Sequence, residues 1–106
     1  MQDLPEIRGK LSFRMHGEYK SRGGKLVVAD LEVEGGVLRG VRVSGDFFLD
    51  PPEALSAITG ALEGAPATLA EEELAARIRE ALPPEAEMVG FSPEAVARAV
   101  RRALSS

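Results

Sequence analysis

The sequence contains no cysteine, no tryptophan and no asparagine, and its only glutamine is Gln2. Without cysteine the chain cannot form disulfides, thiolate metal sites, iron–sulfur ligation or a cysteine nucleophile. No run approaches the roughly 18 apolar residues of a membrane span, and no basic start precedes an apolar stretch as in a secretory signal. We therefore expect a cytoplasmic protein without membrane contact. The depletion of Asn, Gln and Cys fits either a thermophilic source or the codon bias of a GC-rich genome.

The 106 residues fit one domain, 1–106, with a modest core. The net charge of -4 is unevenly distributed, because residues 1–45 carry eight Lys and Arg against six acids, whereas residues 46–106 carry five against eleven. A chain that binds nucleic acid over its whole surface is normally basic, so we expect no nucleic-acid partner. A local basic patch that meets an anion or an acidic partner is still compatible with this pattern.

The first half of the sequence alternates between apolar and polar residues, which is typical of half-buried strands. The pattern predicts strands over residues 10–19, 25–34 and 37–44. A Gly-Gly turn follows each of the first two strands, and Gly35-Gly36 suits a type I′ hairpin because both positions need a positive φ. The predicted apolar rows are Leu11, Phe13, Met15 and Tyr19, then Val27, Ala29, Leu31 and Val33, then Val37, Val41 and Val43.

The second half has helical periodicity with three start signals. Asp50 precedes Pro51, Pro52 and Glu53, Thr68 begins a capping-box pattern, and Ser92 precedes a proline. The predicted helix stripes are Leu55, Ile58 and Leu62, then Leu74, Ile78 and Leu82, then Val96, Val100 and Leu104. Residues 88–91 form a short extended segment that could add an edge strand. The order of elements predicts an α+β fold, a three-stranded antiparallel meander with this optional short strand, covered on one face by three helices.

The segment Ser44-Gly45-Asp46-Phe47-Phe48 does not follow the alternating pattern. Adjacent residues of a strand face opposite ways, so one Phe can enter the core while the other needs a separate cover. Two interpretations remain open. The segment could be a strand-to-helix corner with both rings in the core, or the exposed Phe could dock onto another protein.

Several of these motifs together resemble the C-terminal accessory domain of lipoate–protein ligases, most closely the separate small subunit of the bipartite ligases. The resemblance covers about residues 15–82, and residues 91–104 fit the closing helix less specifically. Its most specific part is the segment from Ser44 to Phe48. The other matching motifs are Tyr19-Lys20, Gly23-Gly24-Lys25-Leu26, Gly35-Gly36, Pro51, Leu55, Leu62 and Gly64.

The resemblance implies an accessory subunit of lipoate–protein ligase. In such ligases the large catalytic subunit binds lipoate and ATP with Mg²⁺ and forms lipoyl-AMP, and the lipoyl group then passes to a lysine of a lipoyl-domain protein. The accessory domain is needed for activation and much less for transfer, and it binds no cofactor alone. Two alternatives remain: a binding module of the same fold for lipoyl domains or nucleotides without a ligase partner, and a complete enzyme. No nucleophile–base constellation supports the complete enzyme.

Two groups of residues are candidates for function. Lys20, Gly23, Gly24 and Lys25 could contact ATP phosphates, since exposed turn amides and cations suit an anion; the alternative is a solvated hairpin whose charges discourage edge pairing. Residues 45–48, which are Gly45, Asp46, Phe47 and Phe48, are the candidate partner interface.

Other polar residues have simpler explanations. His16 fits a solvent-facing strand position, and the acids from Glu71 to Glu73 suit a helix N-terminus rather than a metal site. Asp46 and Asp50 flank the two phenylalanines, but Asp50 is assigned to the helix cap. We therefore predict neither catalytic residues nor a metal site.

Overall fold

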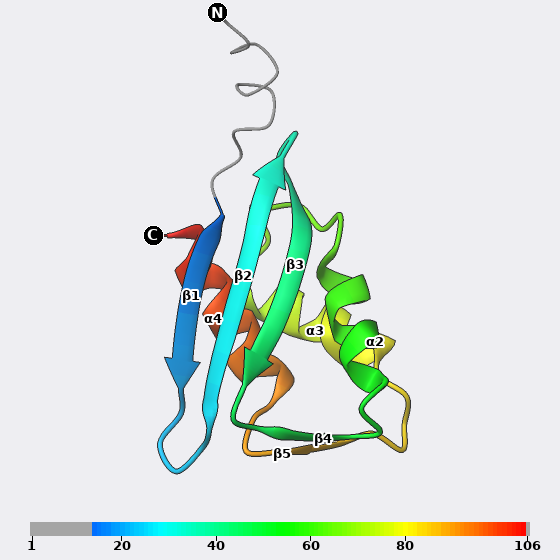
Figure 1. Ribbon diagram of the computed structural model, residues 1–106. Coiled ribbons are helices and arrows are strands. Elements are labelled where there is room, and N and C mark those ends of the chain that lie inside the picture. Colours follow the sequence, from blue (N-terminus) through cyan, green and yellow to red (C-terminus); the bar gives the residue numbers. More distant parts are fainter. Residues whose placement is uncertain (1–13, 106) are drawn as a thin grey trace, which may run out of the picture.

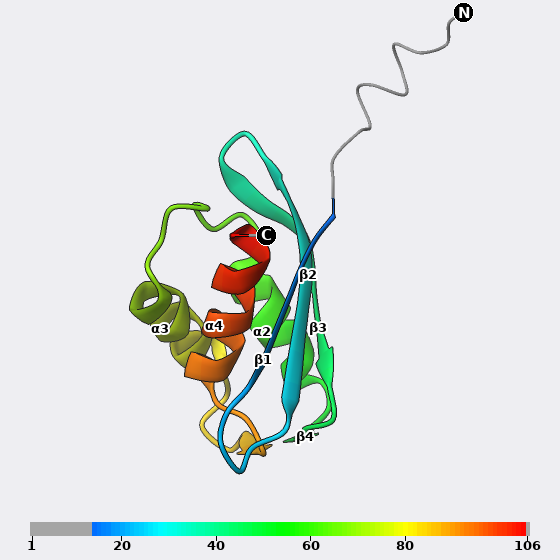
Figure 2. The same cartoon turned by 90° about the vertical axis from the view of Figure 1, so that its left-hand side faces the viewer.

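The structure is a computed structural model that describes residues 14–105. An antiparallel sheet of order β1-β2-β3 forms one layer and three helices form the other, all on the same face of the sheet (Figures 1 and 2). The α+β prediction with helices over one face is thus confirmed. The elements of these layers are β1 (Met15–Lys20), β2 (Leu26–Glu34), β3 (Val37–Gly45), α2 (Ala54–Leu62), α3 (Glu71–Ala81) and α4 (Pro93–Leu104).

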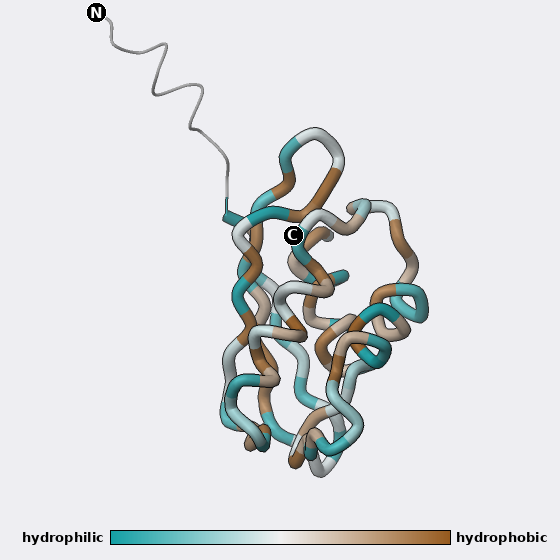
Figure 3. Tube along the Cα trace, turned by 90° about the vertical axis from the view of Figure 1, so that its right-hand side faces the viewer, coloured by the Kyte–Doolittle hydropathy of each residue, from teal (hydrophilic) through white to brown (hydrophobic). Residues whose placement is uncertain are grey.

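The sheet follows the predicted alternation over most of its length, and Figure 3 shows hydropathy alternating along the strands. The inward row of β2 is fully buried at Val27, Ala29 and Leu31. Gly35 and Gly36 have φ angles of 59° and 81°, as the predicted hairpin turn requires. The part of the first predicted strand before residue 14, including Leu11 and Phe13, lies outside the described residues.

A β-bulge in β3 changes which residues of this strand face the core. The pairing shifts between Asp30 and Glu32 of β2, and Gly40 adopts a φ of +60°. The additional residue places Leu38 in the core, fully buried, on the same face as Val41. The prediction that Val37 belongs to this inward row is therefore wrong, because a bulge reverses the alternation on one side of it.

The carboxylate of Glu63 stabilises this bulge. Its two oxygens accept hydrogen bonds from the backbone N–H groups of Gly40 and Val41, at 2.8 and 2.9 Å. The bond from Val41 is the main cause that lowers the pKa of Glu63 below its ordinary value. The edge of β3 at the bulge is thus held by a side chain from the end of α2.

Two predicted helix caps are wrong. Asp50 belongs to a short strand, β4 (Phe48–Asp50), and α2 begins four residues later. The residue before α3 is Ala70 rather than Thr68, and its N–H donates to the carboxylate of Glu73 at 2.9 Å. Asp50 is paired with Glu87 of the facing short strand, so the helix cannot begin there. Thr68 lies in a turn in which the N–H of Leu69 donates to the carbonyl of Pro66, and α3 begins only after this turn.

The extended segment after α3 forms a second, separate sheet. β5 (Glu87–Val89) pairs antiparallel with β4 and not with the edge of the main sheet. The predicted short strand thus exists, but the position expected for it is wrong. The two strands lie across one end of the molecule (Figure 1).

The last helix, α4, packs against β1, β2 and α3 and buries its apolar face there. Ser92 caps it as predicted, its hydroxyl accepting a bond from the N–H of Ala95 at 3.1 Å. The helix packs so closely on β1 that a Cβ at Gly17 would lie 2.2 Å from the carbonyl oxygen of Ala99. No helix within residues 14–105 is long and apolar enough to span a membrane.

Candidate partner-docking surface

The basic turn between β1 and β2 is fixed by backbone hydrogen bonds. The N–H of Gly24 donates to the carbonyl of Ser21 at 2.9 Å, and Gly23 has a φ of +73°. The N–H of Lys25 donates to the carbonyl of Gly90 at 2.8 Å, so the turn is joined to the segment after β5. The turn is therefore part of the end of the molecule that carries β4 and β5.

The cations of this turn are exposed. Within residues 14–105, no ion pair and no side-chain hydrogen bond involves Lys20, Arg22 or Lys25. The stem of Lys25 packs against Gly90, where an added Cβ would lie 2.4 Å from the Lys25 Cγ. The ammonium groups are thus available to an external anion.

The corner after β3 requires its glycine. Gly45 has a φ of +151°, and a Cβ there would lie 2.1 Å from the carbonyl oxygen of Leu26. The next N–H, that of Asp46, donates to the same carbonyl at 3.2 Å. This close approach to β2 turns the chain away from the main sheet, so the two phenylalanines lie at the β4–β5 end.

The two phenylalanines have different environments. Phe47 is partly buried and stacks on Phe91, with ring centroids 3.8 Å apart and planes inclined by 14°. Phe48 is 60% exposed, and its cross-strand partner Val89 is 54% exposed. These are the exposed large apolar residues of the described chain, and they lie opposite each other.

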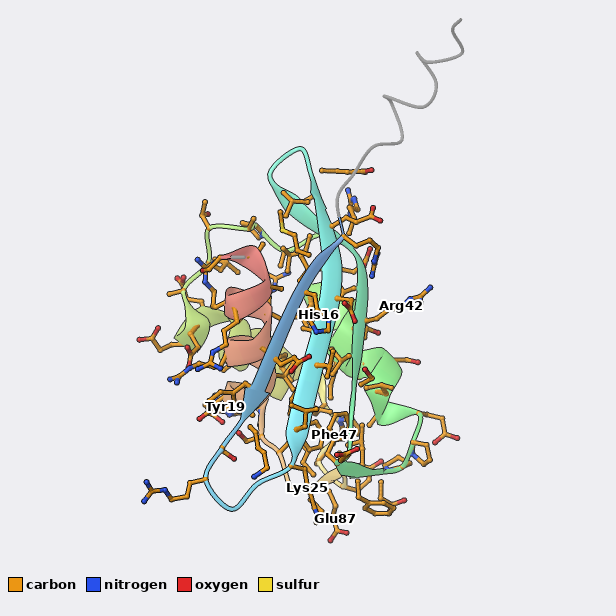
Figure 4. All side chains as sticks on the ribbon, turned by 60° about the vertical axis from the view of Figure 1, so that its left-hand side comes forward. His16, Tyr19, Lys25, Arg42, Phe47 and Glu87 are labelled. Carbon is orange, nitrogen blue, oxygen red and sulfur yellow. The ribbon has the colours of Figure 1, made fainter. Side chains whose placement is uncertain are left out.

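We call the exposed side chains of Lys20, Arg22, Lys25, Phe48 and Val89 the docking surface. Figure 4 shows Lys25, Phe47 and Glu87 at this same end, whereas His16 and Arg42 lie higher on the sheet. Asp46, Asp50 and Glu87 are also exposed near it, so the apolar pair has charges of both signs around it. Such a surface, an apolar centre with a polar rim, is the usual composition of a protein interface.

The sequence indicates most but not all of this surface. Two predicted groups that are far apart in the sequence lie at one end of the fold. They are the candidate phosphate contacts Lys20, Gly23, Gly24 and Lys25, and the candidate interface residues Gly45, Asp46, Phe47 and Phe48. The sequence does not indicate Val89 as part of this surface, although it predicts the extended segment that contains it. Val89 joins the surface because it pairs with Phe48 across the β4–β5 ladder, and a pairing between segments so far apart cannot be read from the local sequence. Contact of these residues with a phosphate or a partner remains a prediction.

His16 lies on the open face of the sheet, as predicted, but it is not isolated. Its two ring nitrogens are each 2.7 Å from a carboxylate oxygen, one of Asp30 and one of Glu18. These two hydrogen bonds raise the pKa of His16, with that to Glu18 the larger cause. Within the described residues no cluster of three acidic or histidine side chains could hold a metal ion.

Comparison with known proteins gives one structural likeness. No family model matches the sequence, and no curated protein is significantly similar to it. A chain of a solved structure from Thermoplasma acidophilum matches with a TM-score of 0.69 and 22% identity, over 86% of this chain and 98% of that one. The structure is described as an archaeal lipoylation system, a bipartite lipoate protein ligase and its E2 lipoyl domain. At this identity the likeness shows a shared fold.

Proposed function

We propose that this chain is the accessory subunit of a two-chain lipoate–protein ligase. The observation that carries the proposal is the fold likeness to a chain of a bipartite lipoate ligase system, over nearly the whole of both chains. The motif from Ser44 to Phe48, with its required glycine and its exposed ring, adds to it. A location in the cytoplasm is part of the proposal.

In the proposed complex the catalytic subunit holds lipoate, ATP and Mg²⁺. Activation forms a bond between a lipoate carboxylate oxygen and the α-phosphorus of ATP, and pyrophosphate leaves. Both reactants are anions, so the reaction is favoured by added positive charge and by exclusion of water. A small domain that closes over a partner's site supplies both.

The docking surface would contribute to this reaction in two ways. Burial of Phe48 and Val89 against the catalytic subunit would hold the two chains together and exclude water. Lys25 would then lie at the interface, with its stem fixed against Gly90 and its ammonium free for the phosphates. Lys20, and the turn amides at Gly23 and Gly24, would assist.

The experiment mixes this chain with a lipoate-ligase catalytic chain that lacks such a domain, with ATP, Mg²⁺, lipoate and a lipoyl-domain acceptor. The proposal predicts that mass spectrometry detects lipoylated acceptor only when both ligase chains are present. Full lipoylation without this chain would contradict it. Lipoylation of a lysine in this chain would instead identify an acceptor, and binding of lipoyl domain or nucleotide alone would favour the binding-module alternative.

A further inference from the structure

Within residues 14–105, the chain covers the outer edge of β3 over only the first half of the strand. Residues 63–66 lie along it, with Pro66 bridged antiparallel to Val37. The N–H of Leu38 donates to the carbonyl of Ala65 at 2.9 Å. Beyond the bulge, from residue 42 to residue 45, the edge has no backbone hydrogen bond to any described residue outside β2.

The hydrogen-bonding groups at this uncovered edge can be assigned. The N–H of Val41 points away from β2, to Glu63, whereas the N–H of Asp46 points toward β2, to the carbonyl of Leu26. In a strand these directions alternate from residue to residue. The N–H and C=O of Val43 therefore point to the uncovered edge. Such unpaired groups are the template on which an added strand forms.

A groove runs along this part of the edge. It has a volume of about 460 Å³ and is lined by Asp30 of β2, by residues 41–44 of β3, and by the side chains of Leu55, Ser56 and Thr59 of α2. Figure 1 shows α2 beside β3 at this position. The volume is within the range of about 300–1,000 Å³ that ligand sites occupy. The apolar and hydroxyl side chains of α2 would contact a backbone or a small side chain.

The charge beside the groove indicates what the occupant carries. Arg42 is exposed on the open face of the sheet and forms no ion pair within residues 14–105. Its cross-strand neighbour Asp30 is hydrogen-bonded to His16 instead. An acidic residue opposite Arg42 would therefore complete this row of charges, because cross-strand pairs of opposite charge stabilise a sheet.

We propose that residues 42–45 of β3 bind an extended segment of a partner chain as an added antiparallel strand with an acidic residue opposite Arg42. The orientation follows from the chain's own segment at this edge, which is antiparallel. The backbone of the added strand bonds to the N–H and C=O of Val43. Arg42 and Ser44 then occupy non-hydrogen-bonded positions, where opposing side chains are closest. The inference does not depend on the proposed function.

The absence of cysteine allows a direct test by reversible disulfide exchange. In Ser44→Cys the new thiol is the only one, and it lies where a cross-strand disulfide fits. The probe is a peptide with the sequence Cys-Val-Glu between threonines, in which the acid falls opposite Arg42. Thr68→Cys, in an exposed loop, is the matched control. We expect about tenfold more capture at position 44 than at position 68, which corresponds to the net effect of about two backbone hydrogen bonds.

Two altered peptides test the mechanism. Lysine in place of the acid should reduce capture about two- to fivefold, the effect of one cross-strand charge pair. N-methylation of the valine, whose N–H would bond to Val43, should abolish the preference for position 44. Equal capture at both positions, or capture that N-methylation does not change, would overturn the proposal.

A second measurement covers the case in which Ser44→Cys does not fold, as judged by circular dichroism. Amide exchange of Val43 is followed in the unmodified chain with an excess of the same peptide, its cysteine replaced by serine. Slower exchange at Val43 supports strand addition, and unchanged exchange overturns it.

Discussion

Replacing Phe47 and Phe48 by alanine, one at a time, should separate folding stability from partner binding: the Phe47 change should mainly lower stability, and the Phe48 change should mainly weaken binding. Phe47 is partly buried and stacks on Phe91 at 3.8 Å, whereas 60% of Phe48 is exposed in the isolated chain. Neighbouring residues of the same type thus serve as controls for each other. Phe47 should contribute to folding, and Phe48 should contribute to binding of the catalytic subunit.

The expected magnitudes follow from burial. A buried Phe→Ala change costs about 3–5 kcal/mol, so the partly buried Phe47 should cost about 2 kcal/mol including its stacking. At about 4–8 °C per kcal/mol, the melting temperature should fall by roughly 8–16 °C. For Phe48 the loss of stability should be about 0.5–1 kcal/mol.

Binding of the partner would bury the exposed part of Phe48. Of the roughly 200 Å² of a Phe side chain, 60% is about 120 Å². At about 25 cal/mol per Å² this burial contributes up to about 3 kcal/mol. Phe48→Ala should therefore weaken Kd by roughly 30- to 150-fold.

Calorimetric melting of each variant and titration with the catalytic subunit measure the two effects separately. Val28→Ala, a partly buried apolar change on the open face of the sheet, is the control and should leave Kd unchanged. If Phe48→Ala binds as tightly as the unmodified chain, the docking surface is wrong. If both Phe changes lower the melting temperature and neither changes Kd, the assignment of Phe47 to the core and Phe48 to the interface is wrong.

Three further predictions concern charged groups. Lys25→Ala should slow lipoyl-AMP formation about ten- to a thousand-fold. Transfer from pre-formed lipoyl-AMP should be nearly unchanged, since no triphosphate remains by then, and equal losses in the two half-reactions would contradict this role of Lys25. Glu63→Gln should weaken the hydrogen bonds to Gly40 and Val41, and because the carboxylate is exposed the free energy of unfolding should fall by only about 1 kcal/mol. The folded-state pKa of Glu63 is lowered, so this difference should be present above pH 4.5 and lost as the pH falls through the lower pKa of the folded state, as denaturant unfolding at a series of pH values would show. The pKa of His16 is raised by Glu18 and Asp30, so the stability it adds relative to His16→Gln should be fully present below pH 6.5 and lost as pH rises through the folded-state pKa, as denaturant unfolding at a series of pH values would show.

The fold class could be predicted because each element carries its own period. Rows such as Val27, Ala29 and Leu31 alternate as one buried face of a strand requires, and Val96 and Val100 have helical spacing. The bulge at Gly40 could not be found this way. One additional residue reverses the alternation, and the sequence on either side then looks regular.

The missed features depend on contacts between distant segments. Asp50 has the sequence pattern of a helix cap, but pairing of β4 with β5 places it opposite Glu87. The same pairing brings Val89 to Phe48, which completes the apolar centre of the docking surface. Local propensity is therefore informative within an element, whereas a surface built from three segments becomes visible only in the fold.

The central claim is that activation of lipoate requires this chain together with a separate catalytic subunit. Lipoate-dependent exchange of labelled pyrophosphate into ATP tests it most directly, because it reports the activation half-reaction alone. We expect exchange only when both chains are present, and none with either chain by itself. Equal exchange by the catalytic subunit with and without this chain would contradict the account.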